Sequence, residues 1–393
     1  VKRLHVWDDP EVYTFMKDNN FYPNAGSDKV ILTLTNRCNL NCPICFARAN
    51  ELQHNDFDSN RLKELKKYKY IYLTGGEPTV RDDLFSIIKD LKADGHIVAL
   101  FSNGLKLSNE SYAKELKETG VDLIILQLDS VHDDDYQFIR GLPLFDKKNE
   151  AIKNLNKYKI PTYIDSVAIQ GHNMDKLDDF FSFVLKQEYI KIIGFNPLWE
   201  IGRFEDNLFM SCGEIMERIN KTLGLTKKDF ILTNDFLYNY EYLKLKRGKS
   251  SLRKFSKCVI FCLFFFHKNQ IIPLKDIFNI ERINKMLDQL IKKKSSIFSL
   301  MYFWLYLLCN QIFLNFIVNK HFRALAFRML RKWRSLFNRN TYVKNPFHVI
   351  AINTFPTHEN IDFDMVKTCN LLTMSCVDYK ISPGCLHRMK INE

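Results

Sequence analysis

Short apolar runs alternate with longer amphipathic segments over the first half of the chain. The runs rich in β-branched and aromatic residues, which predict strands, are 29–35, 70–74, 97–101, 123–129, 162–169 and 191–197. Apolar residues at helical spacing lie between them, in segments 82–94, 111–119, 146–157 and 174–187. This alternation predicts repeated βαβ units, and therefore an α/β fold whose parallel sheet curves into a partial (β/α)₆ barrel of the TIM type. In such folds, active residues gather on loops after the carboxyl ends of the strands.

The second half of the chain has a different pattern. Residues 206–290 are expected to be mostly helical around one apolar patch at 258–267. Segment 295–319 carries no charge, and 320–339 places apolar residues at helical spacing among arginines. The last part is loop-rich and carries three cysteines. We therefore divide the chain into a lead-in (1–28), a barrel (29–205), a helical extension (206–290), an apolar and basic helical segment (291–340) and a cysteine-bearing C-terminal segment (341–393).

The composition is that of a globular protein, because 46% of the 393 residues are hydrophobic and 26% are charged. It excludes a disordered chain, a collagen-like repeat and a small disulfide scaffold. The formal net charge is +12, and an acid-free stretch between Asp288 and Glu359 accounts for nearly all of it. Its eleven basic residues are Lys292, Lys293, Lys294, Lys320, Arg323, Arg328, Arg331, Lys332, Arg334, Arg339 and Lys344. Because nucleic-acid-binding proteins usually spread their charge more widely, we expect no nucleic-acid partner.

The first nine residues have no apolar run and no small-residue cleavage site, so they do not resemble a signal peptide. The chain contains ten cysteines. Without an export signal, clustered cysteines favour metal binding over disulfide bonds. We therefore expect a cytoplasmic protein.

Three cysteines stand close together directly after the first predicted strand. Cys38, Cys42 and Cys45 have the spacing C-x₃-C-x₂-C. Iron–sulfur clusters are held by Cys thiolates, so three cysteines in one loop can ligate three irons of a four-iron cluster and leave the fourth open to a ligand. The alternative is a structural zinc loop that takes its fourth ligand from elsewhere in the chain.

A second motif distinguishes these alternatives. Gly75, Gly76, Glu77 and Pro78 follow the second predicted strand and precede a helix. Two glycines let the backbone approach a ligand closely, and Glu77 supplies an acceptor for an ammonium group. Alone, this motif is compatible with a plain strand-to-helix turn. One strand after the cysteine loop, it favours a cluster with a bound cosubstrate.

Together these motifs resemble the radical SAM superfamily, over about residues 29–205. The resemblance implies a [4Fe–4S] cluster on Cys38, Cys42 and Cys45, with S-adenosylmethionine (SAM) on the open iron. One electron from the cluster would cleave SAM to methionine and a 5′-deoxyadenosyl radical, which abstracts hydrogen from a substrate. The resemblance also implies which residues bind SAM. Gly75, Gly76, Glu77 and Pro78 would hold its amino group. Ser102 and Asn103 would lie near its carboxylate or ribose, and Asp129 near its ribose. The alternative for the last three is that they cap turns at strand ends.

Longer phrases resemble one subgroup of the superfamily, which includes tetraether lipid synthase and pterin-methylating radical SAM enzymes. These phrases surround the cysteines, continue from Gly75 to Leu84, and end in a Pro197-to-Arg203 stretch. The subgroup implies carbon–carbon bond formation or methylation on a lipid-like or small apolar substrate, with flavodoxin or ferredoxin as electron donor. Ile44 departs from the pattern, because many members have an aromatic residue before the third cysteine. The alternatives are a peptide-modifying maturase and a barrel kept as a non-catalytic scaffold.

Two features of the C-terminal half remain open. Cys258, Cys262, Cys369, Cys376 and Cys385 are candidate ligands of an auxiliary iron–sulfur cluster. Their alternative is burial as small hydrophobic residues, which we expect for Cys212 and Cys309. Segment 295–339 is expected either to form a lid over the barrel mouth or to contact an anionic membrane surface, which would make the protein peripheral to the membrane.

Overall fold

The computed structural model describes residues 28–51, 55–198, 203–204, 208–245, 259–292, 347–353, 372–374, 376 and 381–383. The predicted lid or membrane-contact segment 295–339 lies outside these residues. So do Cys258, Cys309, Cys369 and Cys385, and the expectations for them stay predictions.

The barrel is built on six parallel strands that follow one another in chain order. They are β1 (Lys29–Thr35), β2 (Tyr70–Gly75), β3 (Ile97–Ser102), β4 (Leu123–Gln127), β5 (Thr162–Ala168) and β6 (Ile190–Pro197). Each strand pairs in parallel with the next one, from β1–β2 to β5–β6. This confirms the six strands and the α/β class, and the ends differ from the expected ones by no more than two residues.

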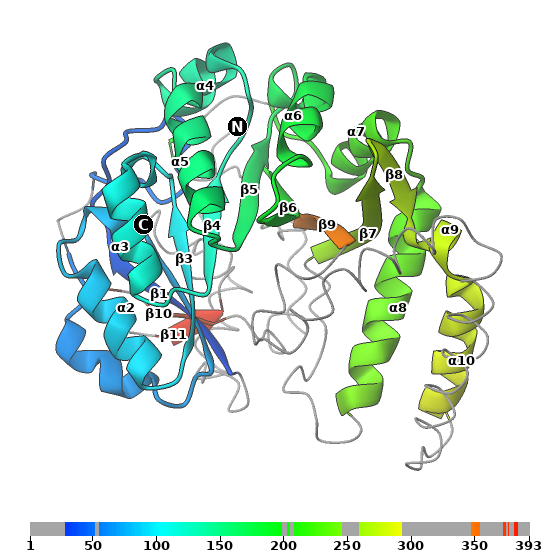
Figure 1. Ribbon diagram of the computed structural model, residues 1–393, viewed down its shortest axis with the longest axis horizontal. Coiled ribbons are helices and arrows are strands. Elements are labelled where there is room, and N and C mark those ends of the chain that lie inside the picture. Colours follow the sequence, from blue (N-terminus) through cyan, green and yellow to red (C-terminus); the bar gives the residue numbers. More distant parts are fainter. Residues whose placement is uncertain are drawn as a thin grey trace, which may run out of the picture.

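The sheet is wider than the six strands that the sequence predicts. Beyond β6 it continues with β9 (Phe347–Asn353), in parallel, and then with the antiparallel hairpin β7 (Val259–His267) and β8 (Gln270–Pro273). Beyond β1 it continues with β10 (Leu372–Met374), in parallel, and with antiparallel β11 (Ile381–Pro383). The described sheet thus has eleven strands, and its edges are supplied by the second half of the chain (Figure 1).

Helices cover the outer face of the parallel sheet (Figure 1). They are α2 (Leu84–Ala93), α3 (Glu110–Glu118), α4 (Asp133–Arg140), α5 (Phe145–Lys157) and α6 (Leu177–Val184). Four of them correspond to the predicted helices. Helix α4 is an addition, and it ends at Gly141 in a left-handed conformation.

Alternation along the strands separates the core from the barrel interior. In β5, the side chains of Thr162, Ile164, Ser166 and Ala168 are buried, whereas those between them are partly exposed. Side chains of successive strand residues point to opposite faces, so the first set packs under the helices and the second set faces inward. Polar groups on the inward set are therefore available to a ligand inside the barrel.

The extension after β6 is helical in part. Helices α7 (Cys212–Leu223), α8 (Lys227–Leu245), α9 (Leu274–Ile277) and α10 (Ile280–Lys292) surround the β7–β8 hairpin. Leu232 of α8 packs against Ile283 and Leu287 of α10 in a separate small core. The expectation of a mostly helical extension agrees with these helices. The described part of the apolar patch at 258–267, for which the sequence predicted no element, is a strand. Among the described residues, no helix is both long enough and apolar enough to cross a membrane.

Candidate SAM and iron–sulfur site

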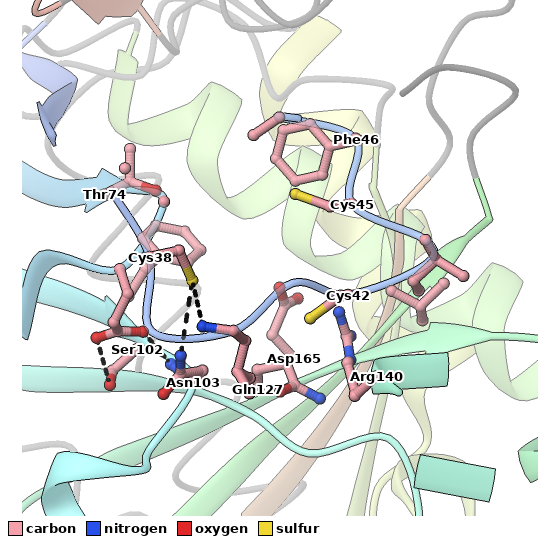
Figure 2. Close-up of a pocket in the computed structure, with 18 of the residues that line it drawn as sticks. Cys38, Cys42, Cys45, Phe46, Thr74, Ser102, Asn103, Gln127, Arg140 and Asp165 are labelled. Atoms are coloured by element: carbon pink, nitrogen blue, oxygen red, sulfur yellow. Dashed lines mark hydrogen bonds between the residues drawn. The ribbon is translucent and has the colours of Figure 1, made fainter. Parts of the chain in front are cut away.

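A cavity opens at the carboxyl ends of strands β1 to β6, where the sequence predicts the active residues. Its lining includes all three cysteines of the C-x₃-C-x₂-C motif, Gly75, Gly76, Glu77, Pro78, Ser102 and Asn103. Figure 2 shows the cysteine loop lying across the ends of the strands. The structure thus brings together the two motifs that the sequence singled out.

Asn50 holds the first half of the cysteine loop. Its side-chain oxygen accepts a hydrogen bond from the Cys38 N–H at 2.8 Å, and its amide nitrogen donates to the carbonyls of Cys38 (3.0 Å) and Leu40 (3.2 Å). Asn50 has a φ of 71°, a left-handed conformation that Asn tolerates better than most residues. One side chain therefore satisfies three backbone groups that the loop leaves outside regular structure.

Arg203 holds the second half of the loop from the far side of the barrel. Its backbone N–H donates to the Cys45 carbonyl at 3.2 Å. Its guanidinium donates to the carbonyls of Cys42 (3.2 Å) and Ala49, and it pairs with Glu51. Hydrogen bonds from Arg203 and Arg48 lower the pKa of Glu51. The chain after β6 is in this way tied to the loop after β1.

The two glycines permit the cysteine loop to lie directly on the end of β2. The Gly76 N–H donates to the Thr35 carbonyl at 2.8 Å, and the Glu77 N–H donates to the Arg37 carbonyl at 2.9 Å. A Cβ atom at Gly75 would lie 2.2 Å from the Thr35 oxygen, and one at Gly76 would lie 2.4 Å from the Arg37 oxygen. Only glycine fits at these two positions, because the obstructing atoms belong to the backbone.

The Glu77 carboxylate joins the ends of β2 and β3. It accepts hydrogen bonds from the Asn103 N–H (2.6 Å), the Ser102 hydroxyl (3.0 Å), and both the N–H (3.1 Å) and the hydroxyl (2.6 Å) of Thr79. The residue is buried, and burial raises the pKa of its carboxyl group. Glu77 is therefore already occupied by protein donors, so its side chain organises the cavity wall. The sequence motif alone does not indicate this role.

Asn103 connects this wall to the cysteine loop. Its amide nitrogen donates to the side-chain oxygen of Asn39 at 2.7 Å and approaches the Cys38 sulfur at 4.0 Å (Figure 2). Burial, together with the nearby charges of Glu77, Cys42 and Cys45, raises the pKa of the Cys38 thiol to about 12. A thiol in this environment becomes a thiolate when a metal binds it, because metal binding displaces the proton.

Asp129 lies behind the cavity rather than in its lining. Its carboxylate pairs with Arg140, with Nε–Oδ2 at 2.8 Å and Nη2–Oδ1 at 3.0 Å, and it also accepts the Val167 N–H at 3.1 Å. Arg140 itself lines the cavity beside Cys42 (Figure 2). Burial opposes the charge of Arg140, but Asp129 and Cys42 outweigh it and raise the guanidinium pKa. The predicted ribose neighbour is thus the partner of a cation that faces the cavity.

Lys148 is a second buried cation that the sequence analysis did not identify. Its ammonium donates to the Gln127 side chain (2.6 Å), to the Gln127 carbonyl (2.9 Å) and to the Asn103 carbonyl. The residue is fully buried, and this burial lowers the pKa of its ammonium group to about 7. Lys148 therefore fixes the ends of β3 and β4 under the cavity. Its place in an amphipathic helix gave no signal, because lysine usually faces solvent there.

Two of the five cysteines predicted for an auxiliary cluster, Cys262 and Cys376, lie in the described part of the chain. They lie in or next to strands near opposite edges of the sheet. Cys262 is fully buried within β7, and burial raises the pKa of its thiol. Cys376 follows β10, and its sulfur lies 3.7 Å from the Asn55 carbonyl. Cys212 opens α7, with its sulfur 3.5 Å from the Asn353 carbonyl.

The donor set of the cysteine loop fits a four-iron cluster with one open iron. Three cysteines, and no fourth among the described lining residues, share one cavity with the Gly75–Gly76 turn. Around them lie hydrogen-bond donors and Arg140, which suit a cluster with negatively charged thiolate ligands.

Comparison with known proteins agrees with this geometry. Residues 32–184 match the model of the radical SAM superfamily. The 7,8-dihydro-6-hydroxymethylpterin dimethyltransferase of Methanocaldococcus jannaschii is 33% identical over 207 residues, which are 49% of this chain and 41% of that protein. The GTP 3′,8-cyclase of Petrotoga mobilis is 26% identical over 211 residues, which are 50% of this chain and 65% of that protein.

Among solved structures, Streptococcus suis SuiB bound to S-adenosylmethionine matches with a TM-score of 0.45 and 16% identity, over 57% of this chain and 51% of that one. The chain spans less than two thirds of the length of each of these relatives. The family match covers most of β1 and strands β2 to β5, with the cysteine loop and the Gly75–Gly76 turn inside it. Residues 32–184 of this chain therefore belong to the radical SAM superfamily.

Proposed function

We propose that this protein is a radical SAM enzyme that holds a [4Fe–4S] cluster on Cys38, Cys42 and Cys45. The observation that carries this proposal is the single cavity shared by these cysteines, the Gly75–Gly76 turn and the polar ends of β3 and β4. When bound on these three cysteines, the cluster would supply the one electron that cleaves a carbon–sulfur bond of SAM to give methionine and the 5′-deoxyadenosyl radical.

The chain's own residues bind and orient SAM. The backbone of Gly75, Gly76 and Glu77, which lines the cavity next to the cysteine loop, binds the amino group of SAM. Arg140 is the one basic side chain among the described lining residues, and it binds the carboxylate of SAM. Asp129 orients Arg140, and Glu77 orients Ser102 and Asn103.

The apolar walls keep water away from a reactive radical. Ile44, Leu198 and Phe204 pack in one buried group at the side of the cysteine loop. Phe101 and Ile125 line the cavity from β3 and β4. A site of this kind prevents side reactions with solvent and leaves the substrate as the nearest hydrogen donor.

The substrate that we propose is a small heteroaromatic molecule, on which the enzyme forms a carbon–carbon bond or transfers a methyl group. Support comes from the names of two relatives, one of which acts on a hydroxymethylpterin and the other on GTP. The pterin and the guanine base contain the same 2-amino-4-oxopyrimidine ring. The lipid-like substrate stays a prediction from the subgroup resemblance, and the membrane contact depends on residues outside the described part of the chain.

The proposal is tested by SAM cleavage. Protein reconstituted with iron and sulfide under anaerobic conditions is reduced with dithionite, and the products are separated by chromatography. We expect 5′-deoxyadenosine from the wild-type protein and only background amounts from Cys42→Ala, because a cluster missing one ligand is not retained in its active form.

The matched control is Cys212→Ser, which changes a half-buried cysteine outside the loop and keeps a donor for the Asn353 carbonyl. We expect this variant to cleave SAM like the wild type. Equal loss of activity in Cys42→Ala and Cys212→Ser would contradict the assignment of the cluster to the loop.

A further inference from the structure

Three polar side chains form a chain of hydrogen bonds across the far side of the same cavity. The Asn353 amide nitrogen, at the end of β9, donates to the Asn196 side-chain oxygen at 2.6 Å. The Asn196 amide nitrogen, near the end of β6, donates to Oδ1 of Asp165 on β5 at 2.7 Å. These residues come from three neighbouring strands, and Asp165 and Asn196 line the cavity.

The donor and acceptor groups of the three side chains determine which residue donates in each hydrogen bond. An amide has one acceptor end and one donor end, and the Asn353 donor occupies the acceptor end of Asn196. The donor end of Asn196 must then face Asp165, where the carboxylate can only accept. The Asp165 carboxylate is in this way held at a fixed orientation at the cavity wall.

The walls next to Asp165 are mostly apolar. The register places Asp165 between Gln127 of β4 and Gly194 of β6. The Tyr163 side chain fills the space over Gly194, where a Cβ would lie 2.1 Å from the Tyr163 hydroxyl oxygen. Val167 and Leu198 add apolar surface to the same part of the cavity. A polar acceptor among apolar walls selects ligands with an apolar face and donors at one edge.

This side of the cavity meets the part assigned to SAM at Arg140, the residue assigned to the SAM carboxylate. The cysteine loop, the Gly75–Gly76 turn and Ser102 follow β1, β2 and β3, whereas Asp165 and Asn196 belong to β5 and β6. Figure 2 shows Asp165 between Gln127 and Arg140. A substrate bound at Asp165 would share the cavity with SAM, as hydrogen abstraction by a SAM-derived radical requires.

We propose that Asp165 recognises the substrate through two neighbouring N–H groups, those of a 2-amino-4-oxopyrimidine ring, and that Asn196 and Asn353 are its positioning residues. The ring N–H and the exocyclic amino group of such a ring point in parallel, as the two oxygens of one carboxylate require. This inference rests on the proposed function, because it concerns the substrate of the same site.

Binding of ring pairs that differ in the amino group tests the proposal. The probes are pterin against lumazine and GTP against ITP, each measured by equilibrium dialysis with the reconstituted protein and SAM. Lumazine has an oxygen in place of the amino group, and ITP lacks it. We expect the wild type to prefer pterin and GTP by about tenfold or more, since a hydrogen bond to a charged group is lost in the analogues.

Substitution of Asp165 shows whether this preference depends on its carboxylate. In Asp165→Asn the preference should fall to within about twofold. Asp90→Asn, the same change at an exposed position of α2, should keep the full preference. Asn353→Ala should reduce the ratio of the pterin affinity to the lumazine affinity. A general loss of structure would instead weaken the binding of both probes by the same factor.

Two results would overturn the proposal. One is a wild-type protein that binds pterin and lumazine, and GTP and ITP, equally well or not at all. The other is an Asp165→Asn variant that weakens SAM binding by the same factor as pterin binding, which would assign Asp165 to SAM. Cleavage of SAM is measured separately, so that a protein that cleaves SAM without the amino-group preference refutes this inference alone.

Discussion

At the scale of single residues, Gly76 shows why the motif requires glycine. The position where its Cβ would lie is 2.4 Å from the Arg37 carbonyl oxygen, on the loop that carries the cysteines. Backbone atoms cannot move aside as a flexible side chain can. The loop itself must therefore shift if residue 76 acquires a side chain, and its cysteines shift with it.

We expect Gly76→Ala to lose stability by about 1–3 kcal/mol, because overpacking forces the backbone to move. Cluster retention should fall as well, since Cys38 is the next residue after Arg37. The measurements are thermal unfolding and the iron content after reconstitution. Gly213→Ala is the matched control, because its Cβ would meet only the Ser211 hydroxyl at 3.7 Å, an ordinary contact. Equal iron contents in both variants would contradict this account.

The sequence motifs predicted the cavity residues around the cysteines but not the buried charges behind them. Few kinds of site combine this cysteine spacing with two glycines one strand later. The sequence therefore identified Cys38, Cys42, Cys45, Gly75 and Gly76. Arg140 and Lys148 stand on helices among other charged residues, and only the fold shows that they turn inward. The three Asp residues that open α4 and the glycine that ends it were the available signal for the helix carrying Arg140.

At the scale of elements, the connection between β6 and the cysteine loop closes the barrel around the site. Arg203 supplies the polar contacts, and Phe204 beside it packs on Ile44 within the loop. Strands β1 and β6, the first and last of the six parallel strands, are thereby joined at their carboxyl ends. This contact explains structurally why the stretch after the sixth strand resembles the family pattern as far as Arg203.

We expect Arg203→Met to loosen the cysteine loop without unfolding the barrel. The carbonyls of Cys42 and Ala49 lose their side-chain donor, at a cost of about 1–3 kcal/mol. Amide hydrogen exchange over residues 42–51 should become faster by about tenfold, and a chelator should remove iron sooner. Arg218→Met removes a more exposed ion pair with Asp175 and should change neither. Identical exchange rates in the two variants would show that Arg203 does not hold the loop.

Prediction of elements from the sequence succeeded for the six parallel strands of the barrel and failed for the β7–β8 hairpin. The strand runs are short, rich in β-branched residues and bounded by turns, which distinguishes them from helices. The β7 run was placed in a helical region because helices flank it on both sides. Its turn, Lys268–Asn269, has positive φ at both residues, a hairpin geometry that asparagine favours.

At the scale of the whole molecule, the second half of the chain completes the sheet. Strands β9, β7 and β8 extend it beyond β6, and β10 and β11 extend it beyond β1. The sequence could not predict these pairings, because they join segments far apart in the chain and periodicity indicates only local structure. Asn353, at the end of β9, shows that this extension also reaches the site.

The most direct measurement of the central claim is the number of irons that depend on the cysteine loop. The reconstituted wild type is compared with the variant in which Cys38, Cys42 and Cys45 are all alanine, by iron analysis and by electron paramagnetic resonance of the reduced proteins. The account predicts a difference of about four irons per chain, and a reduced-cluster signal that changes on addition of SAM and is absent from the variant. Equal iron in the two proteins, or zinc in place of iron, would contradict it.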